Sequence, residues 1–103
     1  MDMRLYLKAK MILFRLDEKY NLDHDGYSGM NCACKVGGDL ITCKVIYGDK
    51  DTPIEREKEH IVTIEVLYGK VDMYKKHLYP GYKFTLHLAS ILLGEGEVLE
   101  VLD

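Results

Sequence analysis

The sequence predicts an all-β protein, a six-stranded antiparallel closed barrel with one short helix between the fourth and fifth strands. Apolar and polar residues alternate with a period of two along most of the chain. Gly and Pro mark the turns, and only one short segment has a helical period. Six short strands in a small domain leave edges unpaired unless the sheet closes, so a barrel or a small sandwich is expected.

Length and composition indicate one domain over residues 1–103. The net charge is -3, which favours a basic protein partner over nucleic acid, because binding a phosphate backbone requires clustered Lys and Arg. The first residues have no secretory signal, and no apolar run approaches the ~20 residues that span a bilayer. Together with three Cys, an odd number, this predicts reduced thiols, a cytoplasmic location and no membrane association.

The first strand is expected over residues 4–16. Its apolar side chains share one face: Leu5, Leu7, Ala9, Met11 and Leu13. The opposite face begins with Lys8 and Lys10 and turns apolar from Ile12, so the later half is expected to be covered on both sides. A helix is the alternative, but the strict alternation at the start favours a strand.

A hairpin is predicted at Gly37-Gly38, between strands at residues 30–36 and 41–47. A two-residue loop would place Cys32 opposite Cys43, whereas a four-residue loop would place Cys34 opposite Cys43. Both registers keep the apolar faces together, and a three-residue loop without a bulge does not. The two registers therefore remain open.

The chain on either side of this hairpin is divided by two polar stretches. An acidic surface loop is expected over residues 17–26 and a charged connector over residues 48–60. The fourth strand follows at 61–68. The spacing of Val71, Tyr74 and Leu78 then predicts about two turns of helix over residues 70–78, ended by Pro80-Gly81.

The last two strands are expected at residues 82–89 and 93–102. In the first of them Phe84, Leu86 and Leu88 fall on the apolar face. Gly94 and Gly96 interrupt the final apolar run, where Gly usually marks a bulge or a sharp bend.

Several short strings resemble the third, C-terminal domain of elongation factor Tu, a six-stranded antiparallel barrel. They are Ala9 to Phe14, Asp25-Gly26-Tyr27, Ile61 to Val66, and Ile91 to Val98 with its Gly-x-Gly. The resemblance implies a shared scaffold. Where that family has Arg-Pro-Gln, this chain has Ser28-Gly29-Met30, and no phosphate-binding Gly-x-x-x-x-Gly-Lys string occurs. The family's contacts with transfer RNA are therefore not carried over.

No pattern of residues indicates a reaction, so the sequence predicts no enzyme, no catalytic residue, no cofactor and no metal site. Cys32, Cys34 and Cys43 are expected in the core, because a zinc site would need a second Cys or His pair. A Cys-based enzyme or a metalloprotein is kept as a third hypothesis. Asp23 and Asp25 lack the Gly and the distal Glu of a calcium loop.

Two acidic loops are the leading candidates for a partner-binding surface. Their residues are Asp17, Glu18, Asp23 and Asp25 in the first loop, and Glu55, Glu57 and Glu59 in the second. The alternative is that these are ordinary solvated charges. A weaker candidate is the aromatic group Tyr74, Tyr79 and Tyr82, whose alternative role is to anchor one end of the barrel.

The leading functional hypothesis is a non-enzymatic protein-binding module, specifically an immunity-type protein that neutralises a basic toxin domain by direct binding. The alternative is a translation-factor-like barrel that contacts transfer RNA or a translation partner. This alternative requires four lysines to form one basic face: Lys8, Lys10, Lys35 and Lys44.

Overall fold

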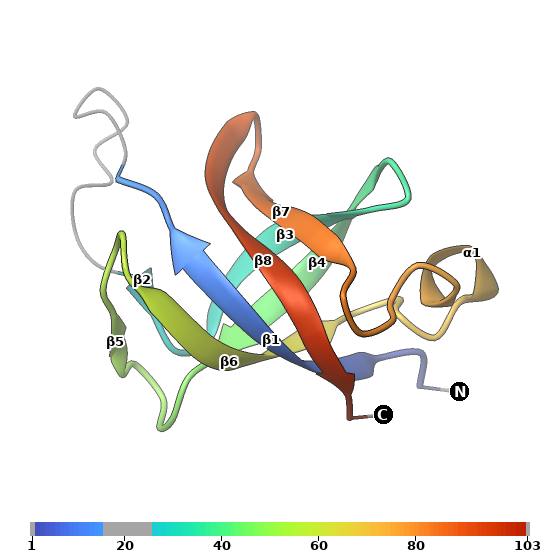
Figure 1. Cartoon of the computed structure of the whole chain (residues 1–103), viewed down its shortest axis with the longest axis horizontal. Helices are drawn as coiled ribbons and strands as arrows, with labels where there is room; N and C mark the ends of the chain where they lie inside the picture. Colours follow the sequence, from blue (N-terminus) through green and yellow to red (C-terminus); the bar gives the residue numbers. More distant parts are fainter. Residues whose placement is uncertain (1, 16–25, 103) are drawn as a thin grey trace.

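The computed structural model describes residues 2–15 and 26–102 and has the predicted closed barrel (Figure 1). Its strands are β1 (Leu5–Leu13), β3 (Met30–Val36), β4 (Asp39–Ile46), β6 (Glu59–Val66), β7 (Lys83–Leu88) and β8 (Ile91–Val101). All neighbours in the ring β1-β6-β4-β3-β7-β8 are antiparallel, and β1 closes it by pairing with both β6 and β8. Helix α1 (Asp72–Lys75) lies between β6 and β7, so the predicted fold class is confirmed.

The barrel interior is filled by alternate side chains of the six strands, as the period of two predicts. All five apolar side chains expected on the inner face of β1 are buried, and Lys8 faces outward. The strand ends at Leu13, earlier than expected. Ile12 and Phe14 are only half-buried, so the outer face of β1 is partly covered here, and Leu16 lies outside the described residues.

The hairpin between β3 and β4 has the two-residue loop, which decides between the two registers left open by the sequence. Cys32 is opposite Cys43, and Cys34 is opposite Ile41. The loop residues Gly37 and Gly38 have φ values of 59° and 94°. Two successive positive φ values define the type I′ turn, which matches the twist of antiparallel strands and which Gly adopts without steric cost.

The connector between β4 and β6 and the segment between β6 and β7 both differ from the prediction. The connector contains a short strand, β5 (Pro53–Ile54), which pairs with β2 (Gly26–Tyr27) in a separate two-stranded sheet. Helix α1 has one turn instead of about two, because Val71 is extended and the chain leaves the helix in a turn at residues 76–77. No helix among the described residues has the length and hydropathy needed to cross a bilayer.

The last hairpin also corrects two expectations. The register shifts between Leu86 and His87, and Leu88, at the last position of β7, is exposed although the alternation predicts it on the apolar face. The bulged positions of β8 are Leu93 and Leu99, which the pairing skips, while Gly94 and Gly96 lie in regular pairs.

Close approach explains both glycines of β8 better than a bend does. A Cβ atom on Gly94 would collide with the carbonyl oxygen of Ile12, and one on Gly96 would lie 2.6 Å from the ring of Phe84. The Phe84 ring therefore packs on the bare backbone of Gly96, a common way to fill the interior of a small barrel.

Candidate partner-binding surfaces

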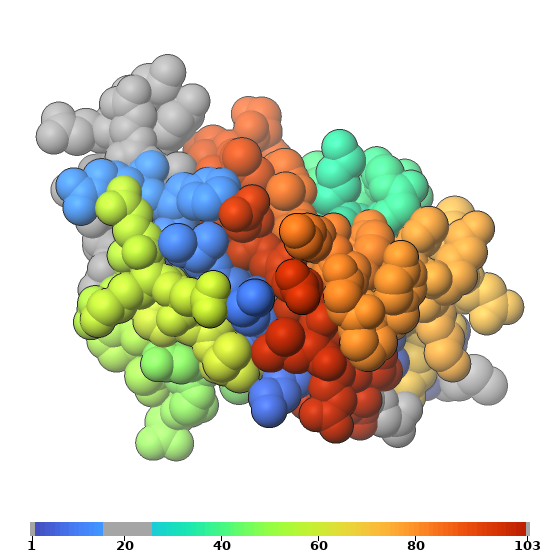
Figure 2. Space-filling view, viewed as in Figure 1, coloured from blue at the N-terminus to red at the C-terminus, as the bar shows by residue number. Residues whose placement is uncertain are grey.

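Two surfaces lie at opposite ends of the barrel (Figure 1). The connector end comprises β2, β5 and residues 47–58, together with Arg15 at the end of β1. The helix end comprises residues 67–82, with α1, and the tip of the β3–β4 hairpin. In the space-filling view these two ends lie on either side of β1 and β8, which form part of the outer wall, the outward-facing surface of the barrel strands (Figure 2). The acidic and the aromatic candidates thus belong to different surfaces.

Ser28 organises the connector end, and sequence reasoning did not single it out. It is the one buried polar residue among those described. Its hydroxyl accepts a hydrogen bond from the Tyr47 N–H at 2.8 Å, its N–H donates to the Thr52 carbonyl at 2.7 Å, and its carbonyl accepts from the Asp51 N–H at 3.0 Å. A serine in a Gly-rich turn usually indicates an exposed position, so only the pairing of β2 with β5 reveals this role.

The described acidic candidates lie on the connector end and at the start of β6. Glu57 has φ 62°, a left-handed conformation unusual for Glu, and its N–H donates to the Leu13 carbonyl at 2.6 Å. Its carboxylate pairs with Arg15 at 3.2 Å, and that of Glu55 pairs with Lys58 at 3.2 Å. All four side chains are more than half exposed. Glu59 lies opposite Ile12 on the outer wall.

The first acidic loop cannot be placed in the same way. Asp17, Glu18, Asp23 and Asp25 lie outside the described residues. The described residues on either side of this segment, Arg15 and Gly26, both contact the connector: Arg15 through Glu57, and Gly26 through its pairing with Ile54.

At the helix end, two of the three candidate tyrosines have structural partners. The Tyr82 hydroxyl accepts a hydrogen bond from the Gly37 N–H at 3.1 Å, and the Tyr74 hydroxyl donates to the Asp39 carboxylate at 3.2 Å. Both rings are half-buried and pack against the core. Tyr74 and Tyr82 therefore fasten the hairpin tip to the helix end, which matches their alternative role as anchors.

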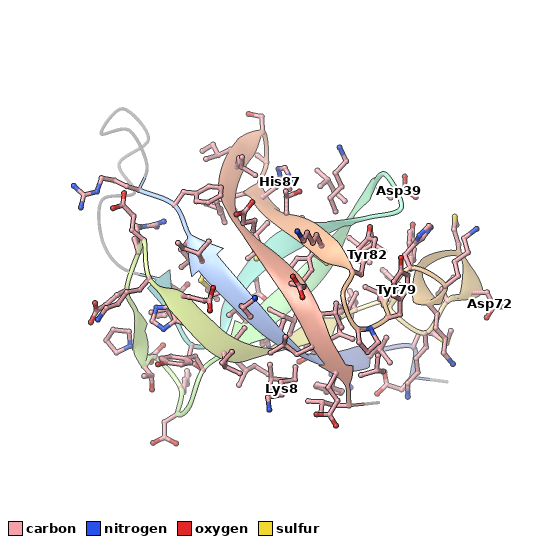
Figure 3. All side chains as sticks on the ribbon, in the orientation of Figure 1. Lys8, Asp39, Asp72, Tyr79, Tyr82 and His87 are labelled. Carbon is pink, nitrogen blue, oxygen red and sulfur yellow. The ribbon has the colours of Figure 1, made fainter. Side chains whose placement is uncertain are left out.

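Tyr79 is the member of this group that faces solvent, with 55% of its surface exposed. Its ring contacts that of Tyr82 edge-on, with 5.9 Å between centroids (Figure 3). Exposed Tyr68 and Met73 lie in the same segment. The helix end thus exposes apolar side chains, and the hydrogen bonds of Tyr74 and Tyr82 fix the backbone beneath them.

The four lysines of the alternative hypothesis do not form one face. They lie on the outer sides of β1, β3 and β4; β3 and β4 are neighbours, and β1 is separated from them by β6 on one side and by β7 and β8 on the other. Lys8 is opposite Glu100, Lys10 is opposite Glu97, and Lys44 is opposite Glu65. Cross-strand neighbours of opposite charge cancel most of the local field, so the described surface has no continuous basic patch at these positions.

A groove of 580 Å³ on the outer wall is a further candidate that sequence reasoning missed. Two rows of side chains cross it: Lys83, Glu97 and Lys10 in one, and Thr85, Glu95 and Ile12 in the other. Lys35 and Glu59 also line the groove, so it has three positive and three negative groups and no preference for ligands of one charge. The sequence shows which of these residues face outward. Only the order of the strands in the barrel shows that they lie next to one another and line one groove.

Thr85 and His87 on this wall form a hydroxyl–imidazole pair, with 2.7 Å between Oγ1 and Nε2. Such a pair is one part of a nucleophilic site, which also needs a group that orients the imidazole. No described residue bonds to the other ring nitrogen of His87. The pair therefore carries no reaction by itself.

The three cysteines are buried in the barrel as free thiols, as the sequence predicts. The described residues contain no group of three or more His, Cys, Asp or Glu arranged to hold a metal ion. The sulfur atoms of Cys32 and Cys43 are in contact, 3.6 Å apart.

Comparison of the chain with models of known protein families and with curated proteins found no match. What the structure confirms of the expected elongation-factor-like domain is the architecture alone, a six-stranded antiparallel closed barrel.

Proposed function

We propose that this protein is a non-enzymatic binding module that recognises a basic protein partner through its connector end, as an immunity-type protein that neutralises a toxin domain does. The observation that carries the proposal is the pair of exposed carboxylates Glu55 and Glu57, whose segment is held on the barrel by hydrogen bonds to main-chain carbonyls at the end of β1. The N–H of Glu57 donates to Leu13, and the guanidinium of Arg56 donates to the carbonyl of Phe14 at 2.9 Å.

This fixation favours binding because ordering a flexible loop on association costs free energy. The connector is already tied to β1 by Glu57 and Arg56 and to β2 by the pairing of β5. Ile54, between these ties, is fully buried. The carboxylates of Glu55 and Glu57 are thus presented from a backbone that needs little rearrangement.

The existing ion pairs of these carboxylates are easily exchanged. Arg15–Glu57 and Lys58–Glu55 are both exposed, and exposed pairs contribute only about 0–1 kcal/mol. A Lys or Arg of a partner can replace them at low cost, especially where contact excludes water. In addition, carboxylates outnumber Lys and Arg in the sequences of both the connector and residues 17–25.

The translation-related alternative has less support. Three of its four lysines face carboxylates across the strands, and transfer RNA would meet a surface of alternating sign. Descent from an elongation-factor barrel is compatible with the proposal, because it concerns only the scaffold that presents the connector.

The experiment is capture of partners from native lysate on the full chain, tagged at one terminus and washed at low and high salt. We expect one stoichiometric basic protein that is lost at high salt. The variant Glu55→Lys/Glu57→Lys should reduce its association rate by about ten-fold or more. The matched control, Glu95→Lys/Glu97→Lys, reverses the same charge on the wall and should bind nearly as the parent does.

Three results would overturn the proposal. One is an empty capture at low salt. The second is capture of RNA or of ribosomal factors, which would favour the translation-related alternative. The third is a captured partner whose binding survives the connector variant but not the wall variant.

A further inference from the structure

We propose that Cys32 and Cys43 form a peroxide-oxidisable dithiol that closes to a disulfide across the β3–β4 hairpin. The proposal concerns the barrel interior and is independent of the partner-binding surfaces. It rests on the register of the hairpin, the contact between the two sulfur atoms, and the difference in exposure between the two thiols.

The register gives the backbone geometry that a disulfide needs. In a hairpin with a two-residue turn, the residues next to the turn form a hydrogen-bonded pair, and hydrogen-bonded and non-hydrogen-bonded pairs then alternate. Val36–Asp39 is the first pair, so Cys32–Cys43 is also of the hydrogen-bonded kind. The Cα atoms of such pairs are about 5.5 Å apart, within the range of native disulfides.

The side chains are also positioned for the bond. Both point into the barrel, and their sulfur atoms are 3.6 Å apart. Closing this gap to the roughly 2 Å of an S–S bond requires side-chain rotation and small backbone adjustment only. Cys34 lies opposite Ile41 and is diagonal to Cys43, so it is the less favourable partner.

The two thiols have different roles in the oxidation. Cys32 is 7% exposed and Cys43 is 1% exposed, so a small oxidant reaches Cys32 first. Either thiol can donate in this contact. With Cys43 as the donor, the bond lowers the pKa of Cys32, and contact with Cys32 and then Cys34 raises the pKa of Cys43. Cys32 is thus the thiolate former and Cys43 the resolving thiol.

The chemistry requires hydrogen peroxide as the oxidant and proceeds in two steps. The Cys32 thiolate attacks one peroxide oxygen, the O–O bond breaks, and the departing hydroxide takes a proton to become water, which leaves a sulfenic acid. The Cys43 sulfur then attacks the Cys32 sulfur, the S–O bond breaks, and water leaves with the thiol proton. Two thiols are oxidised by two electrons, and one peroxide is reduced to two waters.

The disulfide would act on the helix end through the hairpin. The hairpin tip donates the Gly37 N–H to Tyr82 and accepts the Tyr74 hydroxyl at Asp39. A covalent link between the two strands keeps this hairpin from opening. It also removes conformations from the unfolded chain, which raises the free energy of the unfolded state. The oxidised protein should therefore unfold at a higher temperature than the reduced protein, by at least about 5 °C.

The test is treatment of the folded full chain with hydrogen peroxide, followed by alkylation under denaturing conditions and peptide mass spectrometry. We expect a Cys32–Cys43 linked peptide, with Cys34 alkylated. Cys34→Ala should form the same link at a similar rate. In Cys43→Ala the sulfenic acid of Cys32 should persist and be trapped by dimedone.

Several outcomes would overturn the proposal. They are a link that includes Cys34, a disulfide between two chains, or thiols that react only after the protein is unfolded in urea. If Cys43→Ala fails to fold, Cys43→Ser serves in its place, and the identity of the linked peptide in the parent chain decides independently.

Discussion

The connector end and the helix end lie at opposite ends of the same strands, yet the contacts that hold them differ in part. At the connector end most bonds join main-chain groups, such as the N–H of Ser28 with Thr52 and that of Glu57 with Leu13. The helix end also has main-chain bonds to distant segments, such as the Lys70 N–H with Met3 and the Gly81 N–H with Val98. In addition, tyrosine hydroxyls bridge separate segments there, as Tyr82 does with Gly37 and Tyr74 with Asp39. Main-chain bonds therefore hold both ends, and the helix end differs in these added tyrosine links.

This difference has a consequence for function. Because main-chain bonds hold the connector, its exposed side chains can change without loss of the loop's shape. At the helix end, Tyr74 and Tyr82 serve the structure, whereas Tyr68, Met73 and Tyr79 are exposed and can vary. At the connector end, exposed carboxylates stand on a segment that is bonded to β1, which supports the proposal that this end is the partner-binding surface.

The largest expected effect comes from the apolar anchor of the connector end. Ile54→Ala should lower the free energy of unfolding by about 2–5 kcal/mol, because Ile54 is fully buried and its loss leaves a cavity. Chemical denaturation measures this. The control Ile61→Ala removes the same atoms from a residue 49% exposed on the wall and should have little effect. A small loss for Ile54→Ala would mean that the connector end is only loosely joined to the barrel.

The next effect concerns the buried hydroxyl of the same end. Ser28→Ala should lower the free energy of unfolding by about 1–3 kcal/mol, because the partly buried Tyr47 N–H loses its acceptor. Urea denaturation, with hydrogen exchange at Tyr47, is the measurement. Ser90→Ala, in the exposed turn between β7 and β8, is the matched control. Equal stability of the two variants would show that water replaces the Ser28 hydroxyl.

A smaller effect is expected for the corresponding bond of the helix end. Tyr82→Phe should destabilise the protein by about 0.5–1.5 kcal/mol, since the Gly37 N–H loses its partner next to solvent. Tyr79→Phe removes a hydroxyl that makes no hydrogen bond to any described residue and should change nothing. Thermal unfolding of both variants compares them directly. Similar losses would contradict the anchoring role of Tyr82.

The smallest effect is a pH dependence at the helix end. Burial, followed by the nearby Asp39 carboxylate, raises the pKa of Tyr74 above its ordinary value of 10.0. The folded protein favours the neutral, protonated phenol of Tyr74. The contribution of this group to stability is therefore complete below pH 10.0, the unfolded pKa, and is lost as the pH rises through the higher pKa of the folded protein. Phenolate absorbance should show Tyr74 titrating at lower pH in Asp39→Asn, with Tyr74→Phe identifying its signal. An unchanged titration would show that Asp39 does not raise the pKa of Tyr74.

The barrel could be predicted because its signals are local and repeated. Alternation in β1, β3, β4 and β6 identifies the inner face of each strand. Two adjacent glycines, which adopt positive φ without strain, identify the turn between β3 and β4. What escaped prediction depends on distant partners. The strand β5 is only two residues long, too short for a period, and exists because β2 pairs with it.

The same reasoning applies to the candidate site. The sequence identifies Glu55, Glu57 and the tyrosines as residue types that bind proteins, but it does not separate an anchor such as Tyr82 from an exposed ring such as Tyr79. Leu88 illustrates the limit within a strand, since it alternates with the buried Phe84 and Leu86 but is exposed at the last position of β7.

The position of β1 in the ring also affects how the barrel is assembled. Both of its partners, β6 and β8, come from the second half of the chain, whereas β3–β4 and β7–β8 are hairpins between neighbouring segments. We expect those hairpins to form early and the closure by β1 to come late, because contacts between distant residues require closing long loops. Until then the apolar face of β1 stays unpaired, so this strand is the segment most exposed to misassembly during folding.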